Sequence, residues 1–142
     1  MLTKDQIIEA ARKVATTHGI PPAIFLGLVE QESNFDTYAM RFEPAFFEHY
    51  EQSALDTEHV GRSISFGLTQ VMGQVARELG FTGKFLSSLC DEATGLEYGA
   101  RKLASCFKSV NGDVTKALLR YNGGGNLQYP AQVVLKSVKY ES

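Results

Sequence analysis

Apolar residues recur at intervals of three and four through most of this chain, and this helical spacing limits the possible folds more than any other feature. The intervals are bounded by residues that begin or end helices, such as Thr3 with Gln6 three positions later, and Gly19. No alternating pattern of useful strand length competes with them. The sequence therefore predicts a mainly α fold, formed by a single domain over residues 1–142, with at most a small β-hairpin.

Six helices are expected, each with its own start or stop signals. They run from Thr3 to Gly19, from Pro21 through Glu32, from Ser65 to Leu79 with a break near Gly73, from Asp91 to Asn111, from Asp113 to Gly123, and from Tyr129 onward. Residues 36–65 show poor periodicity, and we expect a loop with short helical pieces there. A stretch of that length inside a small domain is more often functional than accidental.

Glu32 stands where the second helix calls for an apolar side chain. Helical spacing places it on one stripe with Phe25, Leu28 and Val29, whereas Glu30 falls on the opposite side. Burial and the negative end of the helix dipole both disfavour a carboxylate and should raise the pKa of Glu32. A glycosidase uses such a protonated acid to protonate the leaving sugar oxygen. The alternative interpretation is a salt-bridged glutamate at a fraying helix end.

Net charge and hydropathy exclude several classes of partner. The chain has 14 Lys and Arg against 16 Asp and Glu, which gives a net charge of −2. It therefore has no overall basic charge to attract nucleic acid or an anionic membrane. No segment approaches the ~20 apolar residues of a membrane span, and the N-terminus lacks the apolar region of a signal peptide. We expect no nucleic-acid partner, no membrane span and synthesis in the cytoplasm.

Cysteines and histidines give no sign of a metal centre. Cys90 and Cys106 are not part of a CxxC motif, and we interpret them as reduced thiols. His18, His49 and His59 are scattered, which favours surface or capping roles over ligation. We expect neither a metal nor a cofactor.

Three segments stand out together: E-S-N-F at 32–35, G-L-T-Q-V-M at 67–72 and A-L-L-R-Y-N-G-G at 117–124. In this order they resemble the soluble lytic transglycosylases, whose domain is similar to goose-type lysozyme. That family shows E-S-x-F at the end of a helix, then G-L-x-Q-[IV]-M, and A-x-x-x-Y-N-x-G near the end. The resemblance covers nearly the whole chain and implies a lysozyme-like fold with helices around a saccharide cleft.

The resemblance also implies a reaction and residue roles. It makes Glu32 the catalytic acid, which then acts as base, in cleavage of the β-1,4 bond between N-acetylmuramic acid and N-acetylglucosamine. The muramyl 6-hydroxyl would close a 1,6-anhydro ring in place of water. The cleft residues that it implies are Ser33, Gln70, Met72, Tyr121, Asn122 and Tyr129. The expected partner is the glycan strands of bacterial peptidoglycan, bound by a monomer.

The chain also departs from the family pattern. Thr69 and Gly73 replace the first methionine and the proline of G-L-M-Q-I-M-P, and residues 95–103 lack the asparagine and tyrosine of N-I-x-x-G-x-x-Y-L. These changes bear on cleft geometry and saccharide preference. Residues 40–44 resemble an R-[FY]-E-P stretch of bacteriophage members, which points to a phage lysis or entry enzyme, an endolysin, that acts on the cell wall.

Glu43 leaves the chemistry open. Placed across the cleft from Glu32, it could activate water and make the enzyme a hydrolysing muramidase of the same bond. It could instead pair with Arg41 and organise the loop. A hypothesis of another class is a non-catalytic wall-binding or virion structural module, whose expected signature is loss of the acid, yet Glu32 is present.

Overall fold

The computed structural model of the chain describes residues 1–49 and 57–141. Helices dominate, and the mainly α fold is confirmed. In chain order the elements, with η for a 3₁₀ helix, are α1 (Lys4–Thr17), α2 (Pro22–Ser33), β1 (Met40–Phe42), α3 (Pro44–His49), α4 (Thr57–Arg62), β2 (Ile64–Phe66), β3 (Val71–Met72), α5 (Gly73–Glu78), η1 (Leu86–Cys90), α6 (Glu92–Ser109), α7 (Val114–Asn122), α8 (Tyr129–Ser137) and η2 (Val138–Tyr140). In the part of the chain described, no helix is long and apolar enough to cross a membrane.

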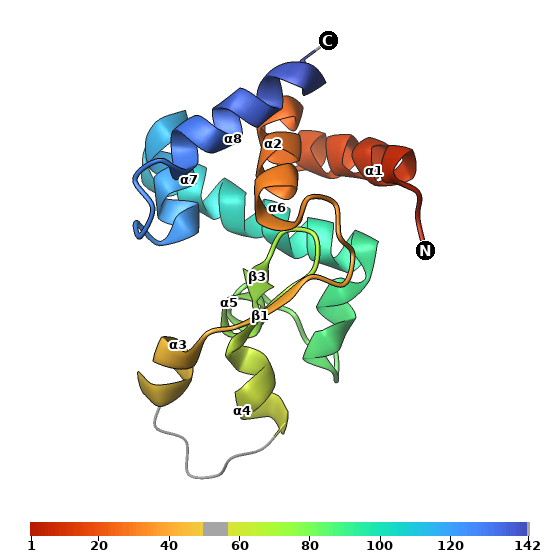
Figure 1. Cartoon of the computed structure of the whole chain (residues 1–142), viewed down its shortest axis with the longest axis vertical. Helices are drawn as coiled ribbons and strands as arrows, with labels where there is room; N and C mark the ends of the chain where they lie inside the picture. Colours follow the sequence, from red (N-terminus) through yellow and green to blue (C-terminus); the bar gives the residue numbers. More distant parts are fainter. Residues whose placement is uncertain (50–56, 142) are drawn as a thin grey trace.

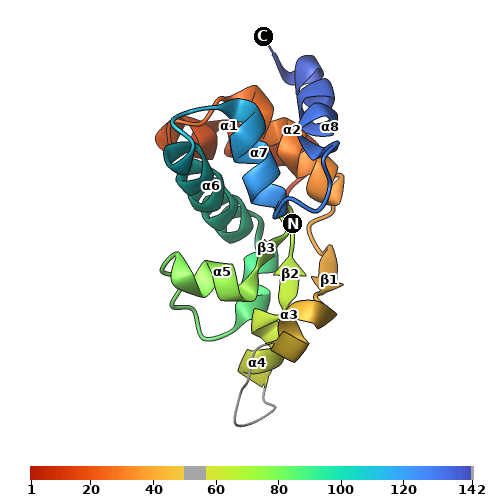
Figure 2. The ribbon, with the colours of Figure 1, turned by 90° about the vertical axis from the view of Figure 1, so that its left-hand side faces the viewer.

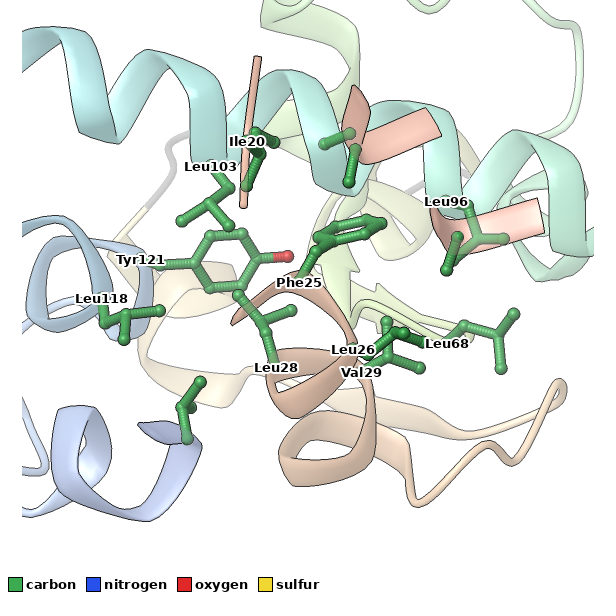
Figure 3. Packing of buried hydrophobic residues seen from close by; sticks show 14 of the residues in the cluster. Ile20, Phe25, Leu26, Leu28, Val29, Leu68, Leu96, Leu103, Leu118 and Tyr121 are labelled. Atoms are coloured by element: carbon green, nitrogen blue, oxygen red, sulfur yellow. The ribbon is translucent and has the colours of Figure 1, made fainter. Parts of the chain in front are cut away.

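The long helices occupy one end of the molecule, and the sheet with the short helices α3 and α4 forms the other part (Figure 1). Helices α1, α2, α6, α7 and α8 surround one apolar cluster, in which Phe25, Leu28 and Leu103 are fully buried (Figure 3). A smaller cluster around Phe66 and Leu89 lies under the sheet. The α2 stripe predicted from the sequence therefore lies in the larger core, which carries Glu32 toward the sheet.

Most helix boundaries follow the predicted signals. Thr3 and Gln6 form the capping box, with donor–acceptor distances of 2.9 and 3.2 Å between the backbone nitrogen of each and the side-chain oxygen of the other. Asp91 and Asp113 accept hydrogen bonds from backbone N–H groups of the first turns of α6 and α7. Gly123 ends α7 at a φ of 85°, a left-handed conformation that suits glycine.

The helix predicted from Phe66 is wrong over its first half. Residues 64–66 form β2, residues 67–70 form a turn, and the helix begins only at Gly73. Gly67 and Gln70 have φ values of 70° and 51°, which no right-handed helix can contain. Ser65 does not cap a helix, since its hydroxyl donates to Glu43.

The small sheet has three short antiparallel strands in the order β1-β2-β3, one more than the predicted hairpin. Met40 pairs with Phe66, and Ser65 pairs with Met72. The short helices expected within residues 36–65 are present as α3 and α4, while strand β1 was not predicted. The sheet brings residues 40–43 beside residues 65–72, and this pairing forms one wall of the site described next.

Candidate active site

A cavity of about 700 Å³ lies between the sheet and helices α6 and α7. Figure 2 looks onto this side, with α7 above the strands. The lining residues are Arg41, Glu43, Phe46, Ser65, Gln70, Met72, Val75, Lys102, Arg120, Tyr121, Asn122, Gly123, Gly125 and Asn126. A recess of about 130 Å³ adjoins the cavity, and each of its lining residues except Glu32 also lines the cavity. Glu32 is therefore reached through the larger space.

The Glu32 carboxyl is largely removed from water at the end of α2. Tyr129, the first residue of α8, donates a hydrogen bond from its hydroxyl to Glu32 Oε1 at 2.7 Å. Burial raises the pKa of Glu32, although the Tyr129 hydrogen bond and the charges of Lys102 and Arg41 oppose the rise. The result is a carboxyl that takes up a proton more readily than an exposed glutamate and that is oriented by one hydrogen bond, as suits a general acid.

Glu43 lines the same recess. It combines the two arrangements that the sequence left open, a position near Glu32 and a contact with Arg41. It stands directly after β1 and faces the space that Glu32 also lines. Its Oε1 accepts a hydrogen bond from the Ser65 hydroxyl at 3.2 Å and lies 3.6 Å from Arg41 Nε. Glu43 is thus near the candidate acid and is also held by neighbours in the sheet.

The turn between β2 and β3 places Gln70 at the cavity. The Gln70 side-chain amide donates to the carbonyls of Ala39 and Gly67, at 2.9 and 3.1 Å. Because these bonds use only the nitrogen, the Gln70 side-chain oxygen remains available to a hydroxyl or amide of a ligand. Met72, at the end of β3, adds an apolar surface to the same wall.

Tyr121 and Asn122 form the opposite wall at the end of α7. Tyr121 is 3% exposed, and its ring lies among the core residues (Figure 3). Its hydroxyl donates to the Thr69 carbonyl at 2.7 Å, so this cavity-lining residue also holds the β2–β3 turn. Asn122 Oδ1 accepts from the backbone of Asn126 at 2.9 Å, which shapes the glycine-containing loop after α7.

Two predicted substrate-binding residues do not line either space. Ser33 directs its hydroxyl to the carbonyls of Leu68, at 2.8 Å, and Val29, at 3.1 Å. It therefore ties α2 to the β2–β3 turn. Tyr129 is 2% exposed and contacts Glu32 from behind rather than from the cavity. In this structure both residues hold neighbouring parts of the site, and their substrate-binding role stays a prediction.

Lys102 is the residue that sequence reasoning missed. It replaces the tyrosine of the family pattern in α6, and it lines both the recess and the cavity. Burial lowers the pKa of Lys102, while the charge of Glu32 opposes the decrease. The available signal was its position on a stripe with Gly95, Gly99 and Cys106, where small residues indicate a buried face.

Residues that could hold a metal are dispersed. Within residues 1–49 and 57–141, no group of three or more His, Cys, Asp or Glu side chains could bind a metal ion. Cys90 and Cys106 are free, buried thiols that belong to different apolar clusters.

Comparison with known families places this geometry in context. Residues 9–132 match the family model described as the transglycosylase SLT domain. No curated protein matches the chain significantly. The matched range includes the whole cavity lining, Glu32 and Tyr129.

Proposed function

The chain belongs to the transglycosylase SLT domain family, whose members are lytic transglycosylases that act on peptidoglycan, and we propose that Glu32 is its catalytic acid and base. It is an enzyme of this type that acts on the bacterial cell wall. We assign it cleavage of the β-1,4 bond between N-acetylmuramic acid and N-acetylglucosamine, with 1,6-anhydromuramyl ends as product.

One observation carries the assignment to Glu32. Its carboxyl lies in a recess next to a cavity large enough for sugar rings, with its pKa raised by burial and its orientation held by Tyr129. Saccharide sites combine apolar faces with a few fixed polar groups. Here the lining includes Met72 and Tyr121 as residues with apolar surface, and Gln70 and Asn122 as polar ones.

The proposed reaction needs a single carboxyl. Protonated Glu32 gives its proton to the glycosidic oxygen while the N-acetyl oxygen of the muramyl residue bonds to C1, so the leaving sugar departs as an alcohol. The Glu32 carboxylate then takes the proton of the muramyl 6-hydroxyl, whose oxygen bonds to C1 and releases the N-acetyl group. Glu32 is protonated again at the end, and no water is consumed.

Replacing Glu32 with Gln tests this role. The substitution keeps the acceptor for Tyr129 but removes the proton, so peptidoglycan cleavage should fall by about 10²–10⁴-fold. Release of soluble muropeptides measures the rate, and circular dichroism checks that the fold is intact. Glu9→Gln, an exposed position on α1, is the control and should retain full activity. A folded Glu32→Gln variant that retains most of the wild-type activity would contradict the assignment of Glu32 as the catalytic acid.

A second candidate function is hydrolysis of the same bond by a muramidase. It is favoured by the presence of Glu43 in the recess, from which a carboxylate could activate water. The bonds from Ser65 and Arg41 favour an organising role instead. Mass spectrometry of digested peptidoglycan decides between them, since hydrolysis leaves reducing muramyl ends and transglycosylation leaves anhydro ends.

We further propose a role in phage lysis, supported by the resemblance of residues 40–44 to a stretch of bacteriophage members. Arg41 and Glu43, which belong to this stretch, both line the recess. Co-expression in bacteria with a membrane-permeabilising protein should cause lysis that the Glu32→Gln variant does not cause. Co-expression without lysis by the active enzyme would contradict this role.

A further inference from the structure

Lys102 is a cavity residue that the proposed mechanism leaves without a role. Its Nζ donates to the carbonyl of Tyr121 at 2.9 Å and lies 3.9 Å from the centroid of the Tyr121 ring. Among residues 1–49 and 57–141, no carboxylate oxygen lies within 4.0 Å of this ammonium. A protonated lysine has three N–H donors, so two of them lack an acceptor in the part of the chain described.

Burial of such an ammonium is energetically unfavourable unless an acceptor or an opposite charge pairs with it. Removal of a charge from water is unfavourable unless the charge is paired and hydrogen-bonded. Burial accordingly lowers the pKa of Lys102. Because Lys102 lines a cavity that is open to a ligand, an anion entering the cavity could supply the missing partner.

Two more cations reach the same cavity from other elements. Arg41 comes from β1 and lies near Glu43. Arg120 comes from α7, is exposed, and forms no ion pair with a described residue. Besides Glu32, Glu43 is the one acidic residue among the described lining residues of the cavity and recess, against the three basic residues Arg41, Lys102 and Arg120. The cavity lining therefore has more basic than acidic residues, whereas the whole chain has a net charge of −2.

We propose that Lys102, together with Arg120, forms a subsite for a carboxylate carried by the muramyl residue. This inference rests on the proposed function and adds selectivity for acidic muramyl glycans over uncharged ones. The carboxylate has two possible sources. In a peptide-free strand it is the free lactyl group, and in intact peptidoglycan it belongs to the acidic residues of the stem peptide.

The test compares cleavage of matched substrates with and without the negative charge. Peptide-free glycan strands and intact peptidoglycan are each used with carboxylates free or converted to amides. The chain is tested as wild type, Lys102→Met and Arg120→Gln. Lys108→Met is the control, because Lys108 is exposed on the same helix and does not line the cavity. Chromatography of the products gives kcat/KM for each pair.

Amidation should lower the wild-type kcat/KM about tenfold on at least one substrate pair, the scale of one charge-assisted hydrogen bond. The pair that responds identifies the source of the carboxylate. The Lys102→Met variant should have a kcat/KM about tenfold lower on the substrate with free carboxylates, and amidation should not lower it further. The decrease in kcat/KM should be smaller for Arg120→Gln. Lys108→Met should match the wild type.

Wild-type rates indifferent to amidation on both pairs, or a Lys102→Met variant that still discriminates, would overturn the subsite and leave peptidoglycan cleavage unaffected. Binding of the Glu32→Gln protein to free and amidated peptide-free strands, followed by calorimetric titration, separates the two proposals. Tighter binding to the free strands supports the subsite even if no substrate is cleaved. Arg120→Gln, at an exposed position, provides the comparison should Lys102→Met fail to fold.

Discussion

At the scale of single residues, Tyr129 contacts the proposed acid, Glu32, without lining the cavity. Its hydrogen bond to Glu32 Oε1 stabilises the carboxylate form, so Tyr129→Phe should raise the pKa of Glu32 further. Because the first step of the proposed mechanism needs protonated Glu32, the alkaline limb of the pH profile of kcat/KM should move to higher pH. Loss of orientation should lower the optimal rate about tenfold, the scale of a hydrogen bond to a charged group.

The control for this experiment is Tyr140→Phe. The Tyr140 hydroxyl donates to Glu30, a carboxylate on the same helix outside the cavity, so its loss should leave the alkaline limb in place. If the alkaline limb of the Tyr129→Phe variant stays at the same pH or moves to lower pH, then Tyr129 does not act on Glu32.

The sequence could single out Glu32 as a candidate acid but could not predict its surroundings. A charged residue on an apolar helical stripe is visible in the sequence, and the buried Phe25, Leu28 and Val29 confirm that stripe. Lys102 lies on a similar stripe, but its small neighbours gave a weaker signal. The hydrogen bond from Tyr129 to Glu32 depends on how α8 packs on α2. Local sequence patterns do not predict such packing.

At the scale of elements, the β2–β3 turn depends on Gly67. Its φ of 70° is left-handed, and an added Cβ would lie 2.8 Å from the Leu89 carbonyl oxygen. Gly67→Ala should therefore cost about 2–4 kcal/mol in free energy of unfolding, from backbone strain and from the clash together. It should also lower activity, because the turn carries Gln70. Urea unfolding and muropeptide release measure the two effects.

Gly112 provides the matched control for this turn. Its φ of 83° is also left-handed, but nothing lies within 4 Å of an added Cβ. Gly112→Ala should cost only about 1 kcal/mol and leave activity unchanged. Equal costs at the two positions would mean that the contact with Leu89 is unimportant.

The same turn explains why the sequence predicted a helix there. Apolar residues from Phe66 to Leu79 match helical spacing, and Ser65 is a good N-cap residue. The strands contain only two or three residues, too few to show alternation, and β2 pairs with β1 from a distant part of the chain. Helices that end in their own cap residues were predictable, whereas a sheet held by distant pairing was not.

At the scale of the whole molecule, the two apolar clusters are joined by buried polar bonds through the β2–β3 turn. Leu68 belongs to the larger cluster, and Ser33 donates to its carbonyl at 2.8 Å. Thr69 is fully buried, donates to the Gly95 carbonyl at 2.8 Å and accepts from Tyr121 at 2.7 Å. We propose that these bonds make the chain a single cooperative domain, although each end has its own core.

Calorimetry should therefore show one unfolding transition with equal calorimetric and van't Hoff enthalpies. Tyr121→Phe leaves the Thr69 carbonyl without its donor and should lower the free energy of unfolding by about 1–3 kcal/mol. Tyr38→Phe, at a side chain 65% exposed, should change it little. Two separate transitions in the wild type would show that the helical and sheet ends fold independently, and that the cleft between them is an interface between domains.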